Sequence, residues 1–273
     1  TSWTEVGNLT IAKRDGASGG TQSAAFFAGG AGTPGGGDTH SNAQQLWNGT
    51  TWSNSPATLA TARRGLRGTG ASSSAGIGAG GYTPSINAAT GVSLTEEFNI
   101  SLTATTAAAW SSGGNMNTSR RYMAGLGTRP AALAAGGSTS SPGLNETANS
   151  EEYNGSSWTE GNNLNTARVG LGGAGSQTSS IAAGGRTPGN IEEVSSEEYN
   201  GSSWTATPNL NTGRRYVAGF GASETAAVVV GGTTGGAPGA GTKQTATEEY
   251  NGSSWTAGGS MNTAKTGTDG NSV

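Results

Sequence analysis

The sequence contains no cysteine and only one histidine among its 273 residues. The lack of cysteine excludes disulfide bonds, thiolate nucleophiles and cysteine-ligated metal sites. His40 follows a run of glycines and has no second histidine as a partner, so a metal site built on it is not expected. We therefore predict no metal site, no cofactor and no catalytic residue in this chain.

Charge and long apolar runs are also scarce. The chain has 14 basic and 17 acidic side chains, a formal net charge of −3, and no run of one sign. Such a surface offers no electrostatic footprint for a phosphate backbone, so nucleic acid is not an expected partner. No apolar run approaches the ~20 residues of a transmembrane helix, and the first residues lack the pattern of a signal peptide. We expect no membrane span.

Glycine, by contrast, is abundant, and the chain repeats itself. Glycine accounts for 50 residues, and the hydrophobic set makes up 32% of the chain, a composition typical of a folded protein that uses glycine in its turns. The nine residues at 197–205, Glu-Glu-Tyr-Asn-Gly-Ser-Ser-Trp-Thr, recur unchanged at 151–159 and 248–256. An internal repeat favours a single domain over residues 1–273.

Each copy of this nonapeptide predicts a β-hairpin. Asn-Gly flanked by β-formers indicates a two-residue type I′ turn, which places Tyr199 opposite Ser202 and Glu197 opposite Trp204. Alternation along the strands then puts Glu197 and the two aromatic rings on one face, which we expect to be the buried one.

Three markers recur in a fixed order along the chain. Six of the seven tryptophans recur in the same local setting, at Trp3, Trp52, Trp110, Trp158, Trp204 and Trp255, with spacings of 49, 58, 48, 46 and 51 residues. Gly-Gly pairs end an apolar run between successive tryptophans, at 29–30, 80–81, 136–137, 184–185 and 231–232, and a segment ending in Lys or Arg follows each tryptophan. A period near 50 is that of a four-stranded propeller blade. In the fourth unit we expect strands near 169–175, 180–185, 194–199 and 203–206.

The pattern resembles the kelch-repeat family, whose blades carry Gly-Gly after the second strand, an aromatic residue near the end of the third and Trp in the fourth. Here the resemblance rests on Gly184-Gly185, Tyr199 and Trp204 and on their counterparts, which include Tyr153 and Tyr250. It implies an all-β fold, a β-propeller of four-stranded antiparallel blades. The copper oxidases of this class need a cysteine-modified tyrosine, which this chain cannot form. The Asn/Ser/Thr/Gly-rich copies also look similar to repeat proteins of phage virions and bacterial extracellular surfaces.

The chain ends leave the number of blades open. Residues 1–12 look like a fourth strand without its first three, and residues 266–273 look like the start of another blade. Five blades and a spare terminal segment, an incomplete sixth blade, or pairing of the ends with a neighbouring copy would each account for them. We favour five blades, and we expect an unmatched terminal strand to promote assembly with other protein subunits, including filaments.

The repeated side chains are predicted to be structural. Paired glutamates occur in four units, whereas a catalytic residue is normally unique to one blade. The first glutamate of each pair is therefore expected to find a cation such as Arg120, Arg168, Arg214 or Lys265. One tryptophan per blade at a fixed position favours packing between blades over sugar stacking. Asn154, Asn200 and Asn251 satisfy the N-glycosylation pattern, although the turn geometry already accounts for Asn-Gly.

Because the repeated side chains are predicted to be structural, we expect any function to reside on the surface of the propeller. The connections between the second and third strands, at 31–42, 82–91, 138–150, 186–192 and 233–245, are the most variable part of the repeat. We expect a non-enzymatic structural or adhesive propeller of a virion or an extracellular assembly. A lectin-like, glycan-binding propeller is the first alternative, and a propeller glycosidase with carboxylates converging on the axis is the second.

Overall fold

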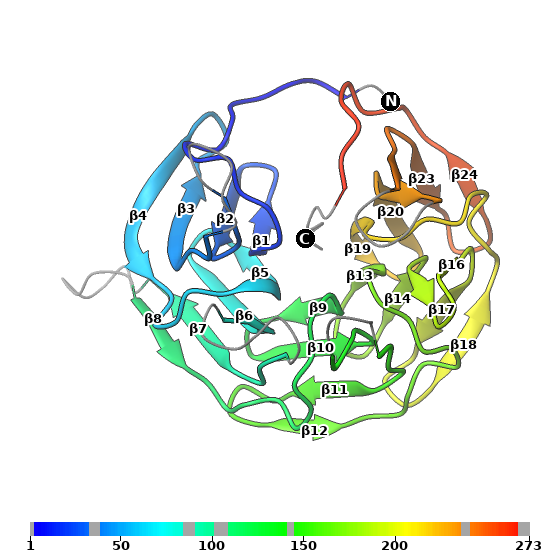
Figure 1. The fold of residues 1–273 in the computed structure, drawn as a ribbon, viewed down its shortest axis with the longest axis horizontal. Coiled ribbons are helices and arrows are strands. Elements are labelled where there is room, and N and C mark those ends of the chain that lie inside the picture. Colours follow the sequence, from blue (N-terminus) through cyan, green and yellow to red (C-terminus); the bar gives the residue numbers. More distant parts are fainter. Residues whose placement is uncertain are drawn as a thin grey trace.

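A computed structural model describes residues 3–32, 39–83, 91–100, 109–140, 145–235 and 241–266. Every regular element among these residues is a β-strand, and twenty of the strands form five four-stranded antiparallel sheets arranged around one axis (Figure 1). The predicted all-β propeller with five blades is therefore confirmed. None of the described residues forms a helix long and apolar enough to cross a membrane.

The blades are numbered in chain order, and each runs from the axis outward. The first comprises β1 (Ala17–Thr21), β2 (Ala24–Ala28), β3 (Ala43–Trp47) and β4 (Trp52–Thr58), and the second β5 (Arg64–Ser72), β6 (Ala75–Tyr82), β7 (Thr95–Asn99) and β8 (Ala109–Ser112). The third comprises β9 (Ala124–Thr128), β10 (Ala131–Ala135), β11 (Ser150–Tyr153) and β12 (Trp158–Glu160).

The last two blades carry small extra hairpins. The fourth blade contains β13 (Gly172–Gly175), β14 (Ser180–Ala183), β17 (Ser196–Tyr199) and β18 (Trp204–Thr207), with the hairpin β15 (Arg186–Thr187) and β16 (Ile191–Glu192) in its variable connection. The fifth contains β19 (Ala218–Ser223), β20 (Ala226–Val230), β23 (Thr247–Tyr250) and β24 (Trp255–Ala257), with the hairpin β21 (Thr233–Thr234) and β22 (Thr242–Lys243).

The outer hairpin differs from the predicted two-residue turn. Tyr199 lies opposite Trp204, so the loop has four residues, and the predicted pairing of Tyr199 with Ser202 is wrong. The Asn200 side-chain oxygen accepts hydrogen bonds from the backbone amides of Ser202 and Ser203, both at 2.9 Å, and this side-chain cap holds the longer loop. Only Gly201 has a positive φ, of 87°. Glu197, Tyr199 and Trp204 still share one face, because cross-strand partners point to the same side of a sheet.

The hydrophobic core is divided among the joints between blades. Each of four apolar clusters combines side chains from two consecutive blades, and the one between the third and fourth blades includes Leu126, Leu133, Leu171 and Trp204. The Gly-Gly pairs fit the same joints. Gly184 has a φ of 66°, and a Cβ there would lie 2.9 Å from the carbonyl oxygen of Arg214, which bonds to Gly185 N at 2.8 Å.

The ring of blades is open at one sector. Innermost strands of consecutive blades contact one another from β1 through β5, β9 and β13 to β19. Among the described strands no comparable contact joins β19 to β1, and Figure 1 shows the two on either side of an opening. Residues 3–10 run along the circumference of this sector from the fifth blade to the first.

Candidate functional site

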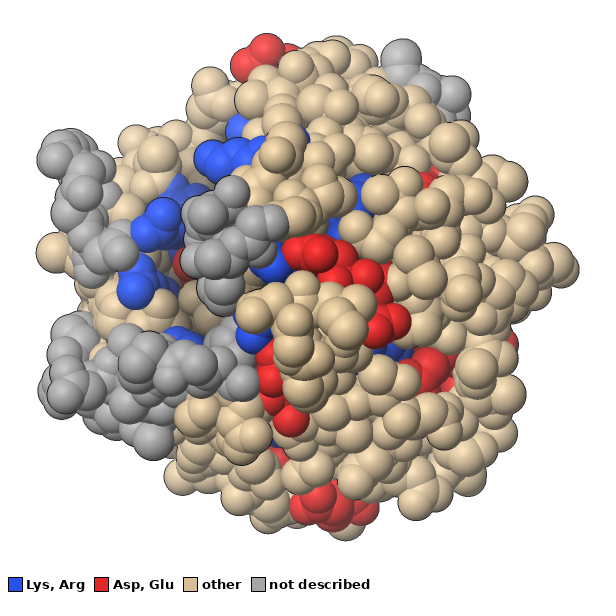
Figure 2. Space-filling model, turned by 45° about the vertical axis from the view of Figure 1, so that its right-hand side comes forward, with Lys and Arg blue, Asp and Glu red and all other residues tan. Residues whose placement is uncertain are grey.

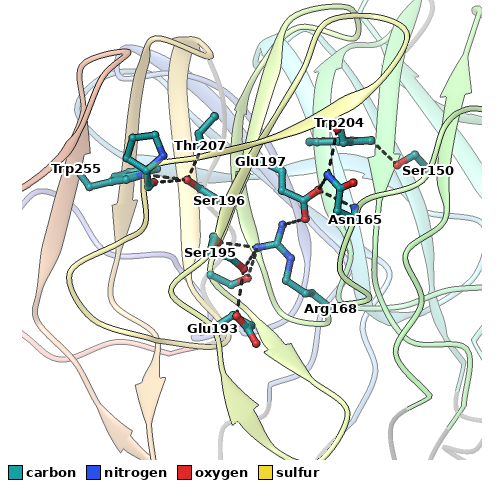
Figure 3. Close-up of polar contacts among 12 residues, drawn as sticks. Ser150, Asn165, Arg168, Glu193, Ser195, Ser196, Glu197, Trp204, Thr207 and Trp255 are labelled. Atoms are coloured by element: carbon teal, nitrogen blue, oxygen red, sulfur yellow. Dashed lines mark hydrogen bonds and ion pairs between the residues drawn. The ribbon is translucent and has the colours of Figure 1, made fainter.

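The repeated Arg–Glu pair lies inside the joint between two blades. Arg168, at the end of the connection that leaves the third blade, donates to Glu197 of the fourth at 2.8 Å and to the carbonyl oxygens of Gly184 and Ser195 (Figure 3). Both side chains are buried. Burial lowers the pKa of the Arg168 guanidinium, and the negative charge of Glu197 opposes that shift. The other Glu197 oxygen accepts from the backbone and side-chain nitrogens of Asn165, both at 2.7 Å.

Three further joints hold the same ion pair. Its members are Arg63 with Glu96, Arg120 with Glu151 and Arg214 with Glu248, at 2.7, 2.8 and 2.8 Å. The predicted partners Arg120, Arg168 and Arg214 are thus confirmed, and Arg63 joins them. Lys265 is different: its backbone bonds to Gln244 and Gly232 of the fifth blade, and Glu248 is already held by Arg214. Each cation reaches into the blade that follows it, which puts Lys265 at the entrance of the open sector.

The second glutamate in three of the four pairs contributes to the next joint. It accepts a hydrogen bond from the tyrosine hydroxyl of the following blade, in the pairs Tyr153–Glu97, Tyr199–Glu152 and Tyr250–Glu198. Between the first and second blades both partners are replaced together, because Phe98 has no hydroxyl and Leu46 packs against its cluster where the glutamate would be. The tyrosine hydroxyl and the glutamate are thus both absent from this joint, so no buried carboxylate is left there without a hydrogen-bond donor.

The tryptophans also reach backward across the joints. The indole nitrogens of Trp158, Trp204 and Trp255 donate to Thr95, Ser150 and Ser196 of the preceding blades at 3.0, 3.0 and 3.2 Å. These three rings and Trp110 are only 5–8% exposed. Gln44 stands at the position of these acceptors in the first blade, and among the described residues the indole nitrogen of Trp110 has no hydrogen-bond partner. Trp52 and Trp3 are more exposed, and both border the open sector.

A second set of residues surrounds the axis on the face that carries the variable loops. At the start of each of the five blades, the residue two positions after the cation is left-handed: Asp15, Tyr122 and Tyr216 have φ values of 57°, 54° and 51°, and Gly65 and Gly170 both have 67°. Left-handed backbone costs a non-glycine residue roughly 1–3 kcal/mol. Three blades have an aspartate or a tyrosine at a position where glycine would avoid this cost. Backbone strain of this kind is typical of binding sites.

The two left-handed tyrosines belong to a tyrosine–arginine cluster, whose members are Tyr82, Tyr122, Tyr216, Arg64, Arg67, Arg121 and Arg215. The Arg64 and Arg121 guanidinium carbons lie 4.9 and 5.1 Å from the centre of the Tyr82 ring. The rings of Tyr122 and Tyr216 meet edge to face at 5.5 Å. Burial in the cluster raises the pKa of both hydroxyls, so these tyrosines stay neutral.

Carboxylates lie next to the cluster but are held by arginines. Arg215 bonds to Glu192 at 2.6 Å, and Arg186 bonds to Glu146 at 2.5 Å. Figure 2 shows basic and acidic side chains gathered in the middle of the view, with further acidic side chains at its upper and lower edges. His40 packs edge-on against Tyr82 at 5.2 Å. Within the described ranges, no three acidic or histidine side chains are grouped so as to hold a metal ion.

The three candidate glycosylation sites are exposed, in the outer hairpin loops. Asn154, Asn200 and Asn251 each use the side-chain oxygen to accept backbone amides of the same loop. Their glycosylation remains a prediction from the sequence. The sequence analysis did not predict the cluster around the axis, although the Arg-Arg-Tyr triplets at 120–122 and 214–216 are a visible signal for it.

No protein-family model matches this sequence. A search among curated proteins likewise finds no match. The architecture is compatible with a kelch-type propeller, and what the protein does has to be argued from the two sets of residues described above.

Proposed function

We propose that the chain is a non-enzymatic, kelch-like propeller that serves as an adhesive module of a virion or an extracellular assembly and binds an anionic glycan through its loop face. The observation that carries this proposal is the left-handed backbone of Tyr122 and Tyr216. Two blades use glycine at that position without strain, so the tyrosines are kept there at a cost.

The chemistry of the cluster suits an acidic sugar. Tyrosine rings offer flat apolar surfaces for sugar rings, and guanidinium groups bind carboxylate and sulfate oxygens in pairs. Tyr122, Tyr216 and Arg64 are partly exposed. The side chain of Arg14 on the same face is 58% exposed. These residues are therefore within reach of a ligand.

The repeated carboxylates support binding over glycoside hydrolysis. Hydrolysis requires two carboxyl groups that can act as acid, base or nucleophile. The first glutamates of the pairs are held by buried arginines, and three of the second ones accept tyrosine hydroxyls. Near the axis, Glu146 and Glu192 each bond to an arginine. These carboxylates are therefore engaged in structural contacts.

Binding of dextran sulfate and polysialic acid, with neutral dextran for comparison, tests the proposal. We expect the anionic polymers to bind and the neutral one not to bind. Arg64→Gln and Arg121→Gln should each weaken binding about tenfold, the loss expected for one charge-assisted contact. Arg129→Gln is the matched control, because Arg129 lies away from the cluster and pairs with Glu97.

The unfolding temperature of each variant separates binding from folding. Weaker binding at an unchanged unfolding temperature supports the proposal. Equal binding by the Arg64, Arg121 and Arg129 variants, or no binding of either anionic polymer, would refute it and leave a purely structural module.

A further inference from the structure

The innermost strands of four blades enclose a small cavity at the axis. Each of β5, β9, β13 and β19 is the last strand of its sheet on the axial side, and all four lie around the centre in Figure 1. The cavity among them measures about 20 Å³, which is room for one occupant of about the size of a water molecule. Its lining includes Arg67 and the glycines Gly68, Gly125, Gly172, Gly173 and Gly219.

Backbone forms much of the cavity wall. The free side of an edge strand carries N–H and C=O groups that no neighbouring strand pairs. Glycine has no side chain to cover these groups, and the close approach of the inner strands requires it. A Cβ on Gly172, for example, would lie 3.0 Å from Gly219 N. Peptide groups from several blades therefore border one small space, and the surface of its wall is mainly polar.

Among the described residues that line the cavity, Arg67 alone is charged. It is the fourth residue after the cation of its unit, a position that small residues occupy in the other four blades: Ala17, Ala124, Gly172 and Ala218. The repeated scaffold therefore does not require an arginine here. A side chain that is unique to one blade and lies at the axis is more typical of a binding site than of the scaffold.

Arg67 is buried and held in position. Its side chain lies in a residue that is 7% exposed, and Nη1 donates to Leu66 O at 3.3 Å. The guanidinium carbon lies 5.7 Å from the centre of the Tyr122 ring. A guanidinium carries five N–H donors, and its charge is poorly screened where water is largely excluded. Its positive potential therefore extends into the adjoining cavity.

A belt of backbone hydrogen bonds fixes the spacing of the strands beside the cavity. Gly65 N donates to Asp15 O at 2.7 Å, Tyr122 N to Gly65 O at 3.2 Å, and Gly170 N to Tyr122 O at 2.8 Å. The residues that directly follow Tyr122 and Gly170 line the cavity. The walls thus belong to strands that the belt joins from blade to blade, which gives a preorganised site on rigid elements.

The geometry points to a binding site at the axis for one chloride-sized monovalent anion, held by the Arg67 guanidinium and by backbone N–H groups of the glycine-lined inner strands. The positive charge selects an anion, and the small volume excludes sulfate, phosphate and the acidic groups of a sugar. The ion links four blades at one point, so its binding stabilises the folded protein. The site is separate from the proposed glycan site, which uses the exposed residues of the loop face, and neither depends on the other.

Thermal unfolding in about 0.3 M sodium chloride, compared with the same concentration of sodium gluconate, tests the site. The two salts give equal ionic strength, and gluconate is too large for the cavity. We expect the unfolding temperature to be higher in chloride by roughly 3 °C, because the ion binds the folded state only. Arg67→Ala should remove this difference. The variant is expected to fold, since alanine stands at the same position in three other blades.

Arg129→Gln is the matched control, because it also removes one positive charge but not at the cavity, and it should keep the difference. The inference is wrong if the two salts give equal unfolding temperatures or if Arg67→Ala keeps the difference. It is also wrong if Arg64→Gln removes the difference, because the ion would then lie in the tyrosine–arginine cluster.

Anomalous diffraction from crystals of the unmodified protein in sodium bromide locates the ion without any variant. A bromide peak in the cavity, within hydrogen-bond distance of the Arg67 guanidinium, supports the inference. Bromide peaks elsewhere on the protein with none in the cavity would overturn it.

Discussion

Replacing Glu197 by glutamine should strongly destabilise the protein. The change keeps the shape of the side chain but removes the charge that opposes the buried Arg168 guanidinium 2.8 Å away. Neither side chain is reached by solvent to any useful extent, at 0 and 3% exposure. Breaking a buried ion pair by removing one partner costs about 3–5 kcal/mol, because the remaining charge stays buried and uncompensated. We expect the free energy of unfolding to fall by about that amount.

The first blade contains a natural version of this change. Gln45 and Lys13 stand where other blades have the glutamate and the arginine. Burial lowers the pKa of Lys13 to about 8, and no carboxylate opposes the shift. A lysine can lose its proton when buried, whereas an arginine cannot. Arg168→Lys combined with Glu197→Gln should therefore cost less than Glu197→Gln alone.

Urea unfolding followed by tryptophan fluorescence measures these differences. A double-mutant cycle over Arg168 and Glu197 isolates the energy of the pair from the bonds that each side chain makes to the backbone. A loss below about 1 kcal/mol for Glu197→Gln, with no coupling to Arg168, would show that the joint is not held by a buried charge pair and would refute this reasoning.

Three further changes test other parts of the structure. Gly201→Val forces a β-branched residue into a φ of 87° and should destabilise by more than 1 kcal/mol, whereas Ser202→Ala should cost less than about 0.5 kcal/mol in the same urea assay; equal losses would contradict the observed loop. Burial, the bond to Glu97 and its charge raise the pKa of Tyr153 to about 12, so stability should fall between about pH 10 and 12, where only the unfolded tyrosine ionises, and Tyr153→Phe should reduce that slope. For Lys13 the pH dependence of stability has the opposite sign. Between pH 8 and about 10.4 the folded protein has released a proton that the unfolded chain still holds, so stability should rise with pH, and Lys13→Met should remove the rise.

The sequence by itself determined the repeat, the four strands of a blade and the structural role of its glutamates. These features are encoded within a single repeat, such as the Gly-Gly pair after β14 and the alternation along β17. The pairing of Glu197 with one of the repeated cations was predictable because a buried carboxylate requires a partner. The turn was not, since the Asn200 side chain caps two backbone amides and favours four loop residues over two.

Only the tertiary structure decided which blades meet and what they leave open. Tyr199 finds Glu152 in the preceding blade, 47 positions away, and nothing local to either residue encodes that contact. The tyrosine–arginine cluster arises because the curvature of the ring brings the starts of the inner strands of several blades to one axis. The open sector has the same origin: the angle between consecutive blades is set by how side chains pack in each joint, and the four joints between the five blades do not bring β19 back to β1.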